Sequence, residues 1–374
     1  MDKQVGGHLL GQGVYGCTFD PAPRCAGGKV FKRVGDLPAV GKVTVEKTGE
    51  ELAVGRAIMA LPLAGNYFAL PTESCRPEAT LRDPEASNCR VMEEEGRSAK
   101  YTMLVMPAAG QQLLRWAENL DVLAASYIAM FAHLLEGIII YQEAGFVHND
   151  IHMGNVLVDE RGVGRFIDFG LAFKPAEIQE WEDSHLGTRF RPKYMWQAPE
   201  VHAWRMRLNG MPVMAGCAQL LAANHELQRI ENQFLTRKRA VEALGEFLES
   251  TNPDDGVGFL RQYAKGFDCW RIGLMFWLLW DDLLAWSGFQ QTALWERRDL
   301  VRQVLCGLTD FDPRVRWSAA QALAALDPNN RLATAHMSVP SASARVAART
   351  ASGKSYRLST RRAPVPAEVR IVQE

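Results

Sequence analysis

The chain has 374 residues, of which 47% are hydrophobic and 23% charged, and its formal net charge is −1. This composition is typical of a globular protein, and the near-neutral charge excludes an overall electrostatic attraction to nucleic acids or membrane surfaces. The length predicts one large two-lobed unit or two domains.

Seven cysteines, an odd number without a Cys-x-x-Cys pair, predict reduced thiols and a cytoplasmic-type environment. A zinc site formed by Cys17, Cys25, Cys75 and Cys89 is the alternative, but the spacings match no known zinc framework. No apolar signal segment opens the chain, and its most apolar run, 272–280, is too short to span a bilayer. We therefore expect no membrane contact.

The first motif along the chain is the Gly-x-Gly-x-x-Gly formed by Gly11, Gly13 and Gly16. Alone, it fits a Rossmann turn and a glycine-rich hairpin equally well. Pro21 and Pro23 interrupt the chain where a Rossmann loop would open a helix, which favours a strand–turn–strand. In such a turn, glycines allow backbone N–H groups to approach phosphate oxygens closely.

Two lysines follow in apolar surroundings, Lys32 and Lys42. We favour Lys42 as the lysine of the next strand, because the residues after Pro23 are typical of a loop and 40–45 of a strand. A helix should then open near Thr48. It offers Glu51, and second Glu50, as a carboxylate partner for the lysine, although Thr48 and Glu51 also fit a capping box.

In the middle of the chain, segments that contain proline or glycine alternate with apolar segments. Residues 71–100 are rich in proline and charge and predict an exposed insertion. An apolar strand is predicted over 101–106, and 107–110 suits a hinge. Apolar residues at three- and four-residue steps predict a long buried helix over 120–143.

The central motif follows that helix. Residues 148–155 read His-x-Asp-x-x-x-x-Asn, and Asp168-Phe169-Gly170 follows a short β-rich segment. Asp150 can accept a proton from a hydroxyl group. Asn155 and Asp168 offer the oxygen ligands that Mg²⁺ prefers beside substrate phosphates.

Three further motifs lie in the second half: Ala-Pro-Glu ending at Glu200, Asp-x-Trp-x-x-Gly beginning at Asp268, and a late Asp-Pro-Arg-Val-Arg run ending at Arg316. Between the first two, 201–262 predicts one or two amphipathic helices, which would pack on the protein or bind a partner. The last segment, 328–374, has eight basic and two acidic residues and few aromatics, which predicts a disordered tail.

In this order, these motifs resemble the protein kinases. The resemblance covers about residues 8–326 and implies an α+β, bilobal protein kinase-like fold. It implies a small, β-rich N-lobe over 1–107, a larger and mostly helical C-lobe over 108–327 with a helical insertion over 201–262, and the basic disordered tail over 328–374.

The resemblance also implies ATP and Mg²⁺ as cofactors and a protein serine or threonine hydroxyl as the acceptor. Asp150 would be the base, Lys42 would hold the phosphates with the help of Glu51, and Asn155 and Asp168 would bind the metal. Residues 171–197 would form the activation segment, which docks the peptide substrate. The nucleotide would contact Leu10, Gly11, Gly13, Gly16, Lys42, Met106 and Leu157.

Two positions depart from the kinase pattern. His152 stands where protein kinases usually have a lysine, and when protonated it would stabilise charge on the γ-phosphate. Asn149 stands where many have the arginine that grips a phosphorylated activation segment. Its presence predicts that phosphorylation of this segment is not the activating event.

One narrower resemblance and two alternatives remain open. Residues 16–25 and 104–107 look similar to serine/threonine kinases of large DNA viruses, which implies a host cytoplasm or virion. A small-molecule phosphotransferase of the aminoglycoside- or choline-kinase type shares the His-x-Asp-x-x-x-x-Asn run. A pseudokinase scaffold would have lost the lysine, the base or the metal ligands. We expect no nucleic-acid partner, except one bound through the basic tail.

Overall fold

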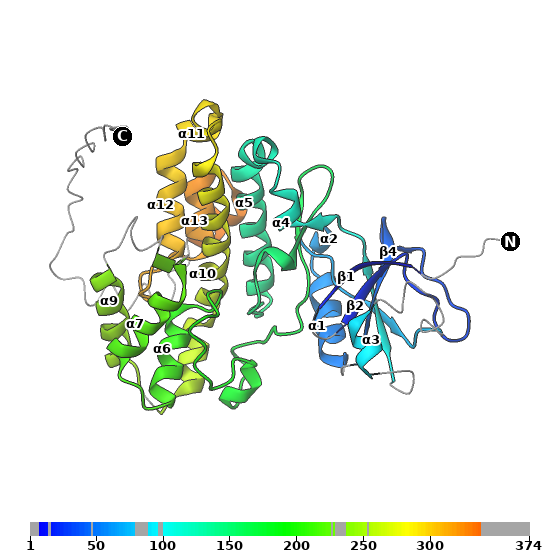
Figure 1. Cartoon of the computed structure of the whole chain (residues 1–374), viewed down its shortest axis with the longest axis horizontal. Helices are drawn as coiled ribbons and strands as arrows, with labels where there is room; N and C mark the ends of the chain where they lie inside the picture. Colours follow the sequence, from blue (N-terminus) through cyan, green and yellow to red (C-terminus); the bar gives the residue numbers. More distant parts are fainter. Residues whose placement is uncertain are drawn as a thin grey trace, which may run out of the picture.

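The computed structural model describes residues 7–13, 16–45, 48–78, 89–95, 100–225, 227–228, 237–252 and 254–337. A smaller lobe built on an antiparallel sheet joins a larger, mostly helical lobe (Figure 1). The expected α+β, bilobal kinase-like fold is therefore confirmed. Of the expected tail, 338–374 lies outside the described residues, and the part before it forms helix α14 (Arg331–Met337).

The small lobe is a sheet whose two faces pack against different parts of the molecule. On β4, Val43 belongs to an outer core with Phe19 and Val105, whereas Val40 packs with Leu104 and Met106 on the opposite face. Because strand side chains alternate, Lys42 shares the face of Val40. The antiparallel order is β1 (His8–Gln12), β2 (Gly16–Asp20), β4 (Leu37–Thr44), β6 (Thr102–Pro107) and β5 (Glu73–Cys75), and β3 (Arg33–Val34) pairs with β4.

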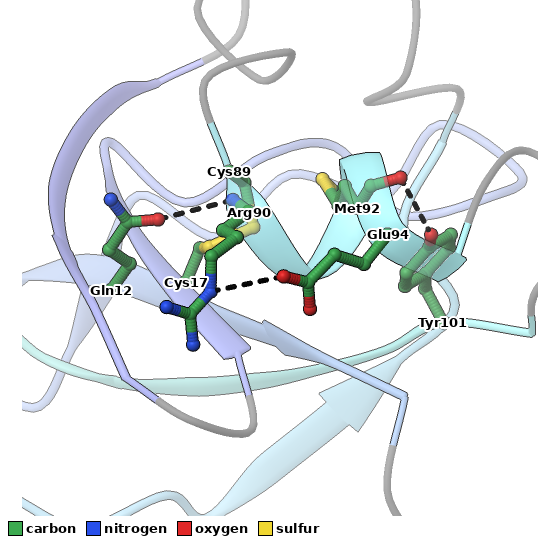
Figure 2. The surroundings of a disulfide bond; sticks show 7 residues. All are labelled: Gln12, Cys17, Cys89, Arg90, Met92, Glu94 and Tyr101. Carbon is green, nitrogen blue, oxygen red and sulfur yellow. Dashed lines mark hydrogen bonds and ion pairs between the residues drawn. A yellow bond between two sulfur atoms is a disulfide. The ribbon is translucent and has the colours of Figure 1, made fainter.

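Two disulfides tie the small lobe together, so the expectation of reduced thiols is wrong for four of the seven cysteines. Cys17 on β2 is bonded to Cys89, which precedes helix α3 (Arg90–Glu95) (Figure 2). Cys25 is bonded to Cys75 on β5. The partners are 72 and 50 residues apart in sequence, and only the folded sheet brings their Cα atoms to 6.0 and 5.8 Å. These cysteines are the four of the alternative zinc site, which the bonds also exclude.

The large lobe is organised around helices α5 (Leu120–Glu143) and α10 (Gly256–Ala285). Phe131 and Phe276 stack with ring centroids 3.9 Å apart, and the Tyr127 hydroxyl donates to the Phe276 carbonyl at 2.6 Å. Among the described residues, α5 alone is long and apolar enough to cross a membrane, but the core helix of a globular lobe meets the same criterion. Its buried side chains belong to the main core cluster.

The insertion over 201–262 also packs on this lobe. It contains most of α6 (Pro199–Leu208), then α7 (Val213–Ala223), α9 (Arg237–Glu249) and the start of α10. Leu220, Leu221, Leu244 and Phe247 are all buried in the main core cluster, which favours the packing interpretation for these helices.

Short elements complete the molecule. Helices α1 (Gly49–Met59) and α2 (Ala64–Tyr67) lie between the lobes. A small sheet consists of β7 (Gln111–Gln112), β8 (Val156–Val158) and β9 (Gly164–Phe166). The central motif, residues 148–155, leads directly into β8. The others are α4 (Leu113–Trp116), α11 (Ala293–Glu296), α12 (Arg298–Leu308), α13 (Ala319–Leu326) and the 3-10 helices η3 (Met153–Asn155), η4 (Trp181–Ser184) and η5 (Phe289–Gln291).

Candidate active site

Three charged side chains meet at the cleft between the lobes. The Lys42 ammonium, from β4, lies 3.0 Å from Oε1 of Glu51 on α1 and 3.2 Å from Oδ1 of Asp168. Burial alone would lower the pKa of Lys42, but the carboxylates of Asp168 and Glu51 outweigh that effect and raise it. Lys42 therefore stays cationic and joins the two lobes.

The alternatives for this group lie elsewhere. Lys32 is exposed in the loop before β3, and Glu50 is exposed on α1. The side chain of Thr48 accepts no capping hydrogen bond at the start of α1, so the capping box that competed for Glu51 is not formed. The geometry assembles Lys42 and Glu51 at the cleft.

A cavity of about 220 Å³ opens beside Lys42. Most residues expected to contact a nucleotide line it, but Leu10 and Leu157 do not. Leu10 is 58% exposed on β1, and half-buried Leu157 pairs with Gln112 in the small sheet. Their positions in the motifs did not reveal which way these side chains face. The lining consists of Gly11, Gln12, Gly13, Gly16, Thr18, Lys42, Glu51, Pro71, Met106, Gln112, Gly154, Asn155, Ile167 and Asp168.

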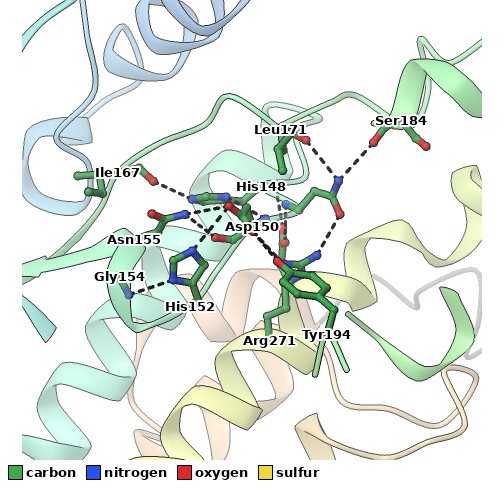
Figure 3. A network of polar contacts seen from close by, with 12 residues as sticks. His148, Asp150, His152, Gly154, Asn155, Ile167, Leu171, Ser184, Tyr194 and Arg271 are labelled. Atoms are coloured by element: carbon green, nitrogen blue, oxygen red, sulfur yellow. Dashed lines mark hydrogen bonds and ion pairs between the residues drawn. The ribbon is translucent and has the colours of Figure 1, made fainter. Parts of the chain in front are cut away.

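Asp150 lies in a network of polar contacts between residues of the large lobe (Figure 3). Its Oδ1 accepts a hydrogen bond from the Tyr194 hydroxyl at 2.9 Å and lies 3.4 Å from Nη1 of Arg271. Its Oδ2 accepts from Nδ2 of Asn155 at 3.1 Å. Burial would raise the pKa of Asp150, but the neighbouring His152 ring and the charge of Arg271 outweigh it and hold that pKa well below its usual range.

The backbone of the loop that carries Asp150 is held by Asp268 of α10. Its two carboxylate oxygens accept from the amides of His148 at 2.8 Å and Asn149 at 3.0 Å, and the Tyr141 hydroxyl donates to it at 2.9 Å. All of these groups are buried, so each hydrogen bond is protected from competition with water. The loop is thus fixed before any substrate arrives.

Asn149 and Asp168 both adopt left-handed backbone conformations, with φ of 61° and 59°. Asparagine and aspartate are the non-glycine residues that best tolerate this region, which fits the residue types found here. Such conformations concentrate at functional sites, where the surrounding structure maintains them. The Asn149 side chain donates to the carbonyls of Leu171 at 3.4 Å and Ser184 at 3.3 Å, so it contacts the activation segment directly.

His152 caps helix η3 and faces the base. Its Nδ1 accepts from the amide of Gly154 at 3.0 Å, and its Nε2 lies 3.7 Å from Oδ2 of Asp150. Because Nδ1 is an acceptor, the ring carries its proton on Nε2, pointing toward the carboxylate. In this tautomer the imidazole is neutral and faces the base as a polar group, because a positive charge would need a second proton on Nδ1 and would break the hydrogen bond from Gly154.

Arg271 is the polar residue of this site that sequence reasoning missed. It lies one turn after Asp268 on α10, has only 1% of its side chain exposed, and contacts both Asp150 and Oδ1 of Asn149. An arginine at a position that the helical pattern assigns to the core was the available signal, because arginine is almost never fully buried without a partner.

The motifs downstream meet in a buried ion pair. Arg316 donates two hydrogen bonds to Glu200, at 2.6 and 2.7 Å, and both side chains are at most 1% exposed. Arg316 also donates to the carbonyl of Gly266 at 3.2 Å, next to the start of the Asp268 motif. The pair fixes the end of the activation segment on α10.

Comparisons with known proteins agree with this architecture. The model of a phosphotransferase enzyme family, APH, matches residues 76–174. MAP3K epsilon protein kinase 1 of Arabidopsis thaliana is 38% identical over 81 residues, which are 22% of this chain and 5% of that protein. Serine/threonine-protein kinase BCK1/SLK1/SSP31 of Saccharomyces cerevisiae is 27% identical over 161 residues, 41% of this chain and 10% of that protein.

A third relative, the mitogen-activated protein kinase kinase kinase MST11 of Pyricularia oryzae, is 26% identical over 210 residues, 53% of this chain and 20% of its own length. The chain therefore spans only a small part of these curated relatives. Together the matches support a kinase-like superfamily. The narrower similarity to viral kinases stays a prediction.

Proposed function

We propose that this protein is an ATP-dependent protein serine/threonine kinase that transfers a γ-phosphoryl group to a hydroxyl held by Asp150. The observation that carries the proposal is the Lys42–Glu51–Asp168 group. The Lys42 ammonium, which would bind phosphate, lies 3.0 Å from Glu51 and 3.2 Å from Asp168, which would bind the metal. All three side chains line the cavity beside the proposed base. The glycine-lined wall and the similarity to MST11 support the same proposal, and the phosphotransferase family match supports phosphotransfer in general.

The glycine-rich hairpin is suited to hold a triphosphate. A Cβ atom at Gly11 or Gly13 would meet no atom within 4 Å, so both residues border open space in the cavity wall. At Gly16 a Cβ atom would come within 2.4 Å of the Val43 carbonyl, so that position requires glycine. Lys42 then supplies the positive charge opposite the hairpin.

The donor set fits Mg²⁺ bound together with phosphate. Nδ2 of Asn155 is engaged by Asp150, which leaves its Oδ1 as the free ligand atom, and Asp168 is 42% exposed toward the cavity. The described residues contain no group of three His, Cys, Asp or Glu that would hold a metal alone. Mg²⁺ usually combines one or two carboxylates with substrate phosphates, and when bound it would neutralise phosphate charge.

Asp150 acts on the acceptor hydroxyl. Its depressed pKa keeps the carboxylate ionised at neutral pH, so it can orient a hydroxyl and accept its proton as the oxygen attacks phosphorus. Lys42 binds the phosphates from the other lobe, and Asp268 keeps the loop in place. Catalysis of this type depends mainly on such positioning and electrostatic stabilisation.

A small-molecule phosphotransferase is the second candidate, because the APH family model matches residues 76–174. That match includes only the first four residues of the activation segment, and it does not reach the buried Glu200–Arg316 pair that anchors the end of the segment and argues for a protein acceptor. We therefore place the small-molecule activity second. The two disulfides also remove the basis of the cytoplasmic expectation, which rested on reduced thiols.

The test is radiolabel transfer from γ-labelled ATP to protein mixtures and, in parallel, to small alcohols and amino sugars. We expect labelled protein with the wild type, and at least a hundredfold loss with Asp150→Asn and Asp168→Ala. Label on small alcohols alone would favour the second candidate. Undiminished transfer in both variants would refute the site, and no transfer at all would favour the pseudokinase scaffold.

A further inference from the structure

The activation segment divides into halves of opposite charge. Residues 171–185 contain four acidic side chains and one lysine, whereas residues 186–197, the basic half, contain no acid at all. The cations of the basic half are Arg189, Arg191 and Lys193, and all three are exposed. Within the described part of the chain, none of them forms an ion pair.

The basic half lies against the proposed base. Tyr194, the next residue after Lys193, donates its hydroxyl to Oδ1 of Asp150 at 2.9 Å. The amide of Tyr194 donates to the Arg191 carbonyl at 3.1 Å, and its carbonyl is 3.1 Å from Nε2 of His202. This turn is therefore fixed beside the position where an acceptor hydroxyl must bind.

A buried arginine, Arg205, lies beneath the basic half and adds to its charge. Arg205, which is 5% exposed, donates to the carbonyls of Leu186 and Gly187 but has no carboxylate partner among the described residues. Its Nη1, like Nε of Arg271, has no hydrogen-bond partner there. Burial first, and then the charges of Arg191 and Arg271, lower the pKa of Arg205 to about 10, so these cations lie close together.

The nearby acids leave most of this charge without a partner. Asp150 pairs with Arg271, and Glu200, the one acid of α6, is fully engaged by Arg316, so neither acid pairs with Arg205 or with the cations of the basic half. Positive charge thus surrounds the acceptor position on the side of the basic half. Surfaces that bind charged partners place complementary charges opposite one another, which favours the correct partner and speeds its association.

We propose that the acceptor is an acidic peptide segment, with aspartate or glutamate within about three residues of the phosphorylated serine or threonine. An extended peptide advances about 3.3 Å per residue, so three residues span about 10 Å, and Arg191 and Lys193 lie within three residues of Tyr194, whose hydroxyl contacts Asp150. This inference rests on the proposed kinase function and names its substrate class. It does not involve a change in the phosphotransfer chemistry.

The experiment uses three peptides that share one central serine and differ only at the flanking positions. These positions carry Asp and Glu in the first peptide, Asn and Gln in the second and Lys in the third. With the full-length protein, ATP and Mg²⁺, we expect kcat/KM for the acidic peptide to exceed that for the neutral one by about tenfold, mostly through KM.

A charge-reversal variant tests the acidic preference more specifically. In the double variant Arg191→Glu and Lys193→Glu, the preference should invert, so that the lysine-flanked peptide becomes the best substrate. Misfolding cannot produce such a gain. The matched control is Arg24→Glu with Arg331→Glu, which makes the same change in net charge at exposed residues of the loop after β2 and the start of α14, and should keep the acidic preference.

The outcomes separate the inference from the proposed function. Equal use of all three peptides, abolished by Asp150→Asn, would overturn the acidic preference and leave the kinase function standing. A preference for the lysine-flanked peptide in the wild type would do the same. If no peptide or protein were phosphorylated, both proposals would fall.

Discussion

The hydroxyl of Tyr194 donates a hydrogen bond to Oδ1 of Asp150 at 2.9 Å. A side chain of the activation segment thus covers the carboxylate oxygen that points toward it, while Asn155 and His152 face the other oxygen. An acceptor hydroxyl that binds Oδ1 must first displace Tyr194. The base is accordingly shielded until a substrate competes for it.

Removing this hydroxyl should make Asp150 easier to reach. We expect Tyr194→Phe to raise kcat/KM for a peptide acceptor by about threefold to tenfold, because one hydrogen bond of about 1 kcal/mol no longer has to be broken. Steady-state kinetics with varied peptide would measure the change. Tyr67→Phe, which loses a hydroxyl bonded to Glu136 outside the cleft, is the control. A fall in kcat/KM for Tyr194→Phe alone would show that the hydroxyl positions Asp150 instead.

Arg271 should set the acidic limit of activity. In Arg271→Met, the pKa of Asp150 should rise, because its buried cationic neighbour 3.4 Å away is lost. Since the base acts only when ionised, kcat/KM of this variant should begin to fall at a higher pH than that of the wild type when the solution is acidified. Arg271→Lys keeps the charge and should restore most of the wild-type profile. A profile unchanged in both variants would contradict this role.

The two lysines considered from the sequence should behave differently. Lys42→Met should lower kcat at least about a hundredfold, because it removes the cation at the phosphate cavity and leaves Glu51 and Asp168 without it. Lys32→Met removes an exposed lysine in a loop and should leave kcat within about twofold. Single-turnover phosphorylation assays would compare them. Equal losses in the two variants would argue against the assignment of Lys42.

The Glu200–Arg316 pair should matter for stability far more than exposed pairs do. Glu200→Gln leaves a buried guanidinium without its counter-ion, which should cost about 3 to 5 kcal/mol. Urea unfolding followed by fluorescence would measure the loss. Glu177→Gln, which breaks an exposed pair with Lys174, should cost less than about 1 kcal/mol. Similar losses of stability in both variants would show that burial does not increase the contribution of the Glu200–Arg316 pair to stability.

His202 should make the protein sensitive to acid. Burial first, and then the charges of Arg205 and Arg271, lower its pKa from 6.5 to about 3. The unfolded chain therefore binds more protons between these two values, and stability must fall as the pH drops from 6.5 toward 3. The pKa values of His148 and His133 are lowered as well, in the same sense.

We expect His202→Gln to remove about 2 kcal/mol of the stability difference between pH 7 and pH 5, because one fully shifted histidine contributes about 1.4 kcal/mol per pH unit below 6.5. Chemical unfolding at the two pH values would measure it. An unchanged difference in the variant would show that His202 is not among the groups responsible.

The sequence was informative where a chemical requirement constrains the residue type. Glycines of the hairpin, the carboxylates and amide of the central motif, and the distant Glu200 and Arg316 could all be picked out. In the structure, the Lys42 ammonium lies within 3.2 Å of both Glu51 and Asp168, and Arg316 donates hydrogen bonds to Glu200. The bilobal fold followed from the order of these motifs.

What the sequence did not reveal depends on directions and long-range pairings. Leu10 and Leu157 have suitable residue types, but neither lines the cavity, whose outline depends on how segments distant in sequence meet. The disulfides link cysteines 72 and 50 residues apart, which local patterns cannot predict. The contact of Tyr194 with Asp150 requires the path of the activation segment in space.

Both disulfides lie wholly within the small lobe, and one of them anchors β2 directly after the glycine-rich hairpin. The large lobe has only free cysteines in its described part, at 217, 269 and 306, and burial raises the pKa of Cys217 to about 11 and of Cys269 to about 12. Reductants should therefore break bonds in the small lobe only. The strand that presents the hairpin to its ligand would gain mobility, while the helical half that holds Asp150 would keep its structure.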